Sequence, residues 1–170
     1  SLAGKFDTVL NVLGNLSLSI AIEKVIQSFN INSPKDQILI QPMLSDIAIS
    51  GVAFTRDPSN GGHYYLVNFD DQSADTTSVT SGSSNDLKVY FHAKGTKPPE
   101  TLWLSKLLSL LSELEGLFNN DSLDIEFAVD KQGSLYLFQV RQLILKSINS
   151  NTLDEQSKIL LDIQKKYSSL

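Results

Sequence analysis

The stretch DIEFAVDKQGSLYLFQVR, from Asp124 to Arg141, decides how this chain is expected to fold. Residues 123–129 alternate apolar and polar side chains, which is the pattern of a strand with one buried face. Residues 130–133 supply turn chemistry, and residues 134–140 form a second β-prone run that contains Tyr136 and Phe138. The stretch therefore predicts an antiparallel β-hairpin.

The polar side chains of this hairpin are grouped by the period of the strand. Asp124 and Glu126 share one face, because side chains two residues apart point the same way. If the strands pair around the turn, Gln139 and Arg141 can lie opposite these carboxylates. Magnesium prefers a few oxygen ligands together with substrate phosphates, and a guanidinium can bind a phosphoryl oxygen. The pattern alone indicates either a nucleoside triphosphate site or a solvated face with an ordinary cross-strand ion pair.

Several segments of the chain resemble one enzyme family. The segments DIEFA at 124–128 and LYLFQVR at 135–141, with the turn glycine Gly133 between them, closely resemble the end of the ATP-grasp nucleotide-binding region of phosphoenolpyruvate synthases and pyruvate phosphate dikinases. SLAGKFDTVLNV at 1–12 is similar to the family's phosphate loop, and ISGVAFTRDPSNG at 49–61 is similar to a strand along its nucleotide cleft. The resemblance implies an α+β ATP-grasp subdomain, with a mainly antiparallel sheet flanked by helices.

The resemblance also implies roles for individual residues. Glu126 and Gln139 would bind magnesium on the phosphates of ATP, with Asp124 adjacent, and Arg141 would contact a phosphoryl oxygen. The other residues that it assigns to the nucleotide are Ala3, Gly4 and Lys5 in the phosphate loop, Gln41 and Met43 in a hinge strand at residues 37–44 that meets the adenine, and Arg56 at the end of the cleft strand, near the phosphates.

In this family the phosphoryl group passes from ATP to a carrier histidine and then to pyruvate. The resemblance thus implies the ATP- and magnesium-binding portion of a phosphotransferase, whose carrier and acceptor domains lie elsewhere in a longer chain. His63 and His92 are isolated, with no partner at metal-ligand or triad spacing, so neither is a candidate for the carrier. The fragment alone is expected to be inactive.

Two departures from the family pattern leave the acceptor open. The usual glycine-rich segment ending in glutamate is replaced by residues 68–82, where Asp70 or Asp71 is either a metal-facing acid or part of a solvated loop. An upstream lysine and arginine that bind the triphosphate in the family have no counterpart here. The alternatives are a synthase-like kinase of surface-polysaccharide modification that acts on an amide such as glutamine, and a nucleotide-binding module without catalysis.

Composition sets the class of the protein. The 170 residues carry a net charge of -5, with no cysteine and no basic patch, so neither a disulfide framework nor a nucleic-acid partner is expected. No apolar run is long enough to cross a bilayer, and we expect a cytoplasmic protein with no membrane partner. We expect a single domain over 1–170, with the phosphate-loop region at 1–14, the sheet within 37–142 and a last helix at 150–168.

The remaining elements follow from hydrophobic periodicity. Residues 16–29 predict a helix packed on a sheet, with Ser17 or Ser19 as its cap. Residues 100–118 predict a second helix, in which Trp103 is a core anchor. The further strands are predicted at residues 49–55, 64–69 and 87–92.

Overall fold

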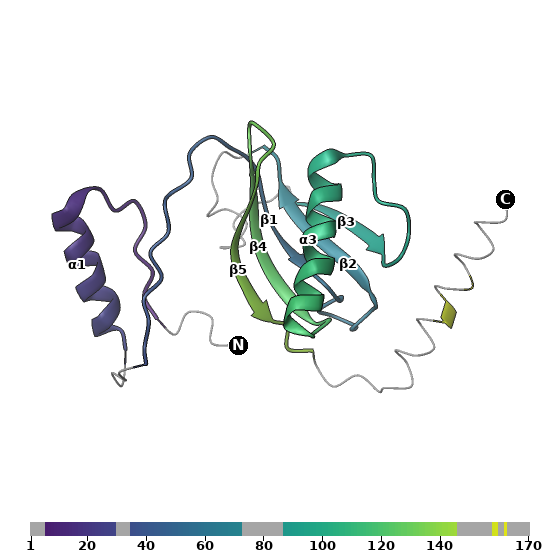
Figure 1. The fold of residues 1–170 in the computed structure, drawn as a ribbon, viewed down its shortest axis with the longest axis horizontal. Coiled ribbons are helices and arrows are strands. Elements are labelled where there is room, and N and C mark those ends of the chain that lie inside the picture. Colours follow the sequence, from purple (N-terminus) through teal and green to yellow (C-terminus); the bar gives the residue numbers. More distant parts are fainter. Residues whose placement is uncertain (1–5, 30–34, 73–86, 146–157, 160–161, 163–170) are drawn as a thin grey trace. The chain divides into compact units, whose positions relative to one another are not determined.

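The computed structural model describes residues 6–29, 35–72, 87–145, 158–159 and 162 of the chain. The chain divides into two compact units, Ser1–Ser45 and Asp46–Leu170. The second unit holds a five-stranded antiparallel sheet and the longer of the two labelled helices (Figure 1). The fold is therefore a mixture of helices with an antiparallel sheet, as the sequence predicted.

Among the described residues of the N-terminal unit, helix α1 (Gly14–Gln27) is the regular element. Its N-cap is Leu13, which makes no side-chain cap bond, so the prediction that Ser17 or Ser19 caps the helix was wrong. Both serines lie inside the first turns, where Ser17 donates to the carbonyl of Leu13 and Ser19 to that of Asn15. A hydroxyl inside a helix bonds back to the preceding turn rather than to free N–H groups.

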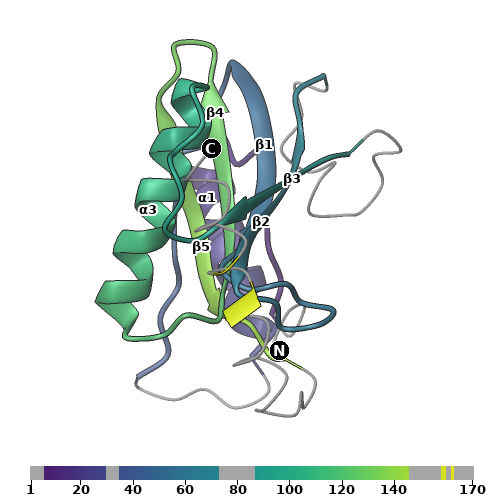
Figure 2. The ribbon, with the colours of Figure 1, turned by 90° about the vertical axis from the view of Figure 1, so that its right-hand side faces the viewer.

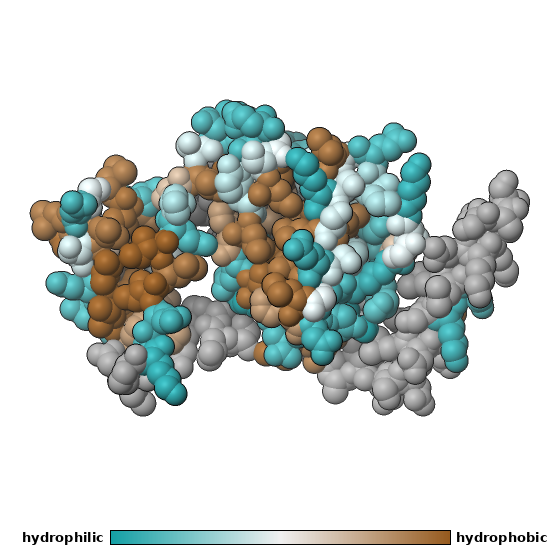
Figure 3. Space-filling view, in the orientation of Figure 1, coloured by the Kyte–Doolittle hydropathy of each residue, from teal (hydrophilic) through white to brown (hydrophobic). Residues whose placement is uncertain are grey.

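The predicted apolar stripe of α1 is partly buried. Ala21 is buried, Leu18, Ile22 and Val25 are half-buried, and Ile26 is exposed. Figure 3 shows apolar side chains gathered over this helix. The burial predicted for the apolar stripe of this helix is therefore seen in part, and the packing of α1 on a sheet stays a prediction.

The hinge strand predicted at residues 37–44 is absent. These residues adopt neither helix nor strand, and Leu39 is 75% exposed. Pro42 cannot donate a ladder hydrogen bond, and a strand also needs a neighbour for its backbone groups. Gln41 and Met43 consequently lie in an irregular, exposed segment of the N-terminal unit.

The sheet of the second unit is antiparallel throughout, in the spatial order β3-β2-β1-β4-β5. The predicted strands are confirmed with small shifts at their ends. Their bounds are β1 Ile47–Phe54, β2 Tyr64–Asp70, β3 Lys88–Ala93, β4 Leu123–Asp130 and β5 Leu135–Gln142.

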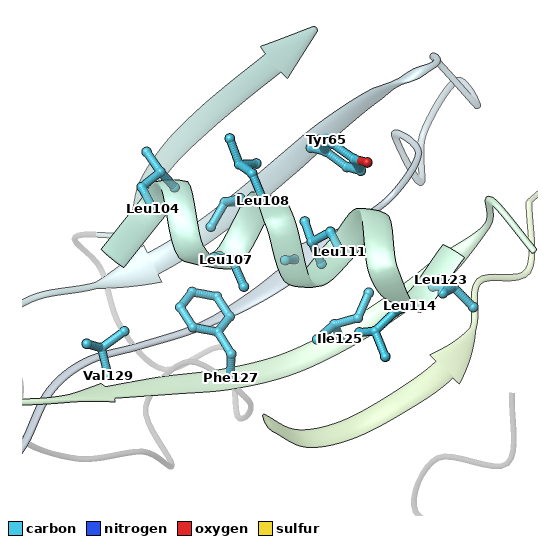
Figure 4. Packing of buried hydrophobic residues seen from close by; sticks show 12 residues of the cluster. Tyr65, Leu104, Leu107, Leu108, Leu111, Leu114, Leu123, Ile125, Phe127 and Val129 are labelled. Atoms are coloured by element: carbon cyan, nitrogen blue, oxygen red, sulfur yellow. The ribbon is translucent and has the colours of Figure 1, made fainter. Parts of the chain in front are cut away.

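Helix α3 (Leu102–Phe118) packs on one face of this sheet, so the unit has one helix layer and one sheet layer (Figure 2). Its apolar residues recur every three or four positions and form a continuous buried stripe. The stripe meets the inward side chains of β4, as Figure 4 shows. The buried residues of the two elements are Leu104, Leu107, Leu108, Leu111 and Leu114 from α3, and Leu123, Ile125, Phe127 and Val129 from β4.

Trp103 anchors the same core, as predicted. Its ring lies 5.1 Å from the Phe69 ring and 6.2 Å from the Phe127 ring, both measured between centroids. Alternation along β4 then fixes the opposite face, because Asp124 and Glu126 must point away from α3. The helix therefore determines which sheet face carries the polar residues.

Two sequence predictions fall largely on residues that the structure does not describe. Ala3, Gly4 and Lys5 of the expected phosphate loop lie outside the described residues, as does most of the expected C-terminal helix. Residues 158–159 and 162, which are described, are helical. Within the described part of the chain, every helix falls short of the length and hydropathy needed to span a membrane.

Candidate functional site

The candidate site lies on the hairpin of β4 and β5. Asp130 organises its turn: its Oδ1 accepts hydrogen bonds from the backbone N–H groups of Gln132 (2.9 Å) and Ser134 (2.8 Å), and Tyr136 Oη donates to its Oδ2 (3.0 Å). Gly133 has φ of 81°, a conformation that a residue with a Cβ rarely adopts. Turn chemistry thus fixes where the two strands begin to pair.

The register brings the four predicted polar residues together. Asp124 is directly opposite Arg141, and Glu126 is directly opposite Gln139. Cross-strand partners share a face of the sheet, so all four lie on the face that points away from α3. The expected cross-strand arrangement is therefore confirmed.

A β-bulge makes this arrangement possible. Next to the turn, Phe127 pairs with Leu137, whereas Glu126 pairs with Gln139, so Phe138 is an extra residue in β5. Such a bulge re-aims the side chains that follow it. The sequence signal is the adjacent pair Leu137 and Phe138, which breaks the alternation of the strand, and our sequence analysis did not use it.

Arg141 contacts both carboxylates. Its Nη2 lies 3.1 Å from Asp124 Oδ2 and 2.9 Å from Glu126 Oε1. The side chains of the two acids are each 20% exposed and that of Arg141 is 30% exposed, so this ion pair is mostly shielded from water. Gln139, by contrast, is exposed beside them.

The electrostatic balance of this cluster leaves negative charge in excess. Burial raises the pKa of Asp124, against the opposing effect of Arg141. Burial also raises the pKa of Glu126; Arg141 opposes this rise and the charge of Asp124 adds to it. Two half-buried carboxylates share one guanidinium, so a ligand that brings further positive charge would be stabilised here.

The donor set fits magnesium better than a metal that requires a complete protein cage. Asp124, Glu126 and Gln139 offer carboxylate and amide oxygens, which are hard ligands. In the described part of the chain, no group of three or more His, Cys, Asp or Glu side chains could hold a metal ion. Magnesium commonly uses one or two carboxylates and takes its remaining ligands from water and substrate phosphates. The cluster matches that requirement.

Apolar residues adjoin the cluster on the same face. Phe54 of β1 lies opposite Asp124, and Val52 lies opposite Glu126. Asp70 also belongs to this face, because it pairs with Ser50 across β1. It stands two strands from the hairpin, roughly 10 Å away at the usual strand spacing. Its carboxylate accepts a hydrogen bond from the backbone N–H of Gln72 (2.8 Å).

Asp71, the other acid expected as a possible metal ligand, forms an ion pair instead. Lys88 Nζ lies 2.6 Å from its Oδ2, and half of the lysine side chain is exposed. A pair of this kind contributes little to stability. Asp71 thus behaves as a solvated surface acid, which was one of the two expectations for this segment.

Arg56 is engaged away from the hairpin cluster. Its guanidinium bonds to the carboxylate of Asp121 and donates to the carbonyl oxygen of Gly61 at 3.1 Å. The bond from Arg56 lowers the pKa of Asp121. His63 Nδ1 lies 3.9 Å from the same carboxylate. The described contacts of Arg56 therefore belong to a second polar cluster.

A further polar network adjoins α3, and the sequence analysis missed it. Lys94 pairs with Glu115, and its Nζ lies 4.9 Å from the centroid of the Tyr65 ring. Tyr65 Oη donates to Glu115 Oε2 at 2.9 Å. Burial raises the pKa of Tyr65 and lowers that of Lys94. These residues are far apart in sequence, so no local pattern could have revealed the network.

No protein-family model matches the chain, and no curated protein matches it.

Proposed function

We propose that this chain is the ATP- and magnesium-binding portion of a phosphotransferase similar to phosphoenolpyruvate synthases and pyruvate phosphate dikinases, with an ATP-grasp arrangement of its sheet. One observation carries the proposal: Asp124, Glu126, Gln139 and Arg141 meet on the sheet face opposite α3, in the register described above. The resemblance of residues 124–141 to that family gives this cluster its proposed ligand.

Each side chain has a distinct role in this proposal. Glu126 and Gln139 would hold magnesium through their side-chain oxygens, and Asp124 would add negative charge beside them. A magnesium ion held by these residues would supply positive charge that neutralises the phosphates. Arg141 would place its guanidinium on a phosphoryl oxygen, where planar donors match the geometry of phosphate. Positioning and charge stabilisation supply most of the catalysis in phosphoryl transfer.

The acceptor in this proposal is a carrier histidine in another domain of a longer protein, which passes the group to pyruvate or a related acceptor. The test uses full-length protein incubated with magnesium and with ATP that carries label on both its β- and γ-phosphates, so that transfer of either phosphoryl group is detected. We expect an acid-labile phosphohistidine in the wild type and none in Glu126→Gln. The control is Glu113→Gln, which makes the same change at an exposed position of α3.

Wild-type turnover by folded Glu126→Gln would refute the role of Glu126. Tight ATP binding without consumption of phosphate would instead favour a nucleotide-binding module that lacks catalysis. If ATP with magnesium does not stabilise the full-length protein against unfolding, the proposed function as a whole is contradicted.

A further inference from the structure

Arg141 makes an incomplete set of contacts for a guanidinium. A single nitrogen, Nη2, contacts both Asp124 and Glu126. Its Nε is buried and has no hydrogen-bond partner. A guanidinium bound in its most favourable way to a carboxylate uses two parallel N–H groups. Arg141 therefore neutralises the two acids without using the paired donors that its planar group offers.

The same guanidinium occupies one of the two side-chain oxygens that Glu126 could offer to a metal. Glu126 Oε1 lies 2.9 Å from Arg141 Nη2, so a divalent cation on that oxygen would stand close to a positive charge. Two cations a few ångströms apart in a mostly buried site repel each other strongly. Metal binding at Glu126 and the contact of Arg141 with Glu126 Oε1 therefore oppose each other.

We propose that Arg141 is an internal counter-ion that is exchanged when metal and nucleotide bind together. This inference rests on the function proposed above. In the free protein, Arg141 balances Asp124 and Glu126. In the loaded site, the metal neutralises the charge of Glu126 in place of Arg141. The guanidinium then contacts a phosphate oxygen, which also gives its Nε a hydrogen-bond partner.

The exchange has a thermodynamic consequence. Metal alone must displace Arg141 without giving it a new partner, so it binds weakly. Metal with a nucleotide offers the guanidinium a phosphate, so each ligand strengthens the binding of the other by the same factor. The site therefore admits magnesium as a complex with nucleotide and discriminates against the free ion.

The experiment measures binding rather than catalysis. Manganese is titrated into full-length protein, alone and with a non-hydrolysable ATP analogue, and the free ion is followed by its paramagnetic resonance signal. In the wild type we expect the analogue to tighten manganese binding about tenfold or more. In Arg141→Met we expect manganese alone to bind about tenfold more tightly than in the wild type. We expect the analogue to tighten manganese binding little further in this variant.

Lys131→Met is the matched control. It removes one positive charge from the same hairpin, but Lys131 forms an exposed pair with Asp46 at 3.6 Å and leaves the cluster intact. We expect wild-type manganese binding in this variant, and thermal unfolding verifies that both variants are folded. Equal affinity of wild type and folded Arg141→Met for manganese alone would overturn the exchange. If Arg141→Met binds manganese more tightly but the analogue does not change manganese binding in the wild type, the proposed nucleotide function is overturned instead.

Discussion

Arg141 lies opposite Asp124 because β5 contains one extra residue compared with a regular ladder that starts at the turn. Beside the turn, Val129 pairs with Leu135, and an unbroken ladder from that point would bring Arg141 opposite Leu123, on the α3 face. The bulge at Phe138 shifts the ladder by one residue and returns the guanidinium to the acidic face. The site and the hydrophobic core are thus kept on opposite faces by a single extra residue.

Two one-residue deletions test this relationship. Deleting Phe138 removes the bulge but keeps Gln139 opposite Glu126 and Arg141 opposite Asp124, so we expect a folded protein that retains magnesium-dependent ATP binding. Binding is measured by calorimetry on the full-length protein. Loss of binding in a folded variant would show that the bulge does more than set the register.

Deleting Val140 is the counterpart. With or without the bulge, either Gln139 or Arg141 then lies opposite Ile125, which is fully buried under α3. An unpaired polar group there costs about 2 kcal/mol or more. We expect the free energy of unfolding in urea to fall by that amount and ATP binding to be lost. Wild-type stability would contradict the register argument.

The raised pKa values of the cluster predict a pH dependence. A carboxyl group whose pKa is higher in the folded state binds more protons there, so the free energy of unfolding falls as pH rises through that window. For Glu126 the window begins near its unfolded value, about 4.3, and ends at its raised folded pKa. Glu126→Gln removes this loss. Relative to the wild type, Glu126→Gln should therefore gain thermal stability as pH rises through this window.

The measurement is the difference in unfolding midpoint between Glu126→Gln and wild type at both ends of this range. Taking the difference cancels acids with the opposite behaviour, such as Asp57, whose pKa is lowered by hydrogen bonds from Ser59 and Tyr64 that outweigh burial. Glu113→Gln, which makes the same change at an exposed position of α3, serves as the control. A constant or reversed difference for Glu126→Gln would contradict the electrostatic account of the cluster.

Much of the second unit could be predicted from the sequence, because its alternation has one physical cause. Leu123, Ile125, Phe127 and Val129 are all buried on the α3 side, and burial selects apolar residues at every second position. The stripe of α3 follows from the same core. Once the hairpin is known, burial of the apolar residues of β4 under α3 places its polar residues on the opposite face of the sheet.

The remaining features depend on information that local patterns do not hold. Residues 37–44 have the composition of a strand, but composition does not supply a neighbouring strand, and Pro42 removes one donor. The bulge depends on how two strands are matched over their whole length, so the turn alone would have given the wrong face for Arg141. The ion pair of Lys94 with Glu115 joins the residue that follows β3 to α3, and only the tertiary fold brings these two segments together.

Thr55 holds the start of β4 in place and so positions Asp124. Its buried hydroxyl donates to the carbonyl of Asp121 (2.7 Å) and accepts from the N–H of Leu123 (2.8 Å). Thr55→Val keeps the shape but leaves both backbone groups without this partner, which should cost about 1–3 kcal/mol of unfolding free energy. Thr55→Ser keeps the hydroxyl and should lose less. Urea denaturation of both variants makes the comparison, and an equal loss would contradict the role of the hydroxyl.

Gly51 marks the closest approach between the sheet and its core. A Cβ at this position would lie 2.4 Å from the carbonyl oxygen of Asn68 and 2.9 Å from the Phe127 ring. Neither neighbour can move without disturbing the β1–β2 ladder or the packing under α3. Gly51→Ala should therefore lower the free energy of unfolding by about 1–3 kcal/mol or more.

At Gly116 of α3, the same glycine-to-alanine substitution is expected to stabilise the protein. A Cβ there meets nothing within 4 Å, and alanine is favoured over glycine inside a helix. Gly116→Ala should raise the free energy of unfolding by about 0.5–1 kcal/mol. Denaturation in urea with both variants tests the pair, because opposite signs follow only if the space at each glycine controls the outcome. A stabilised Gly51→Ala would show that Phe127 can give way, and the tight contact between β1 and the core would then not be required.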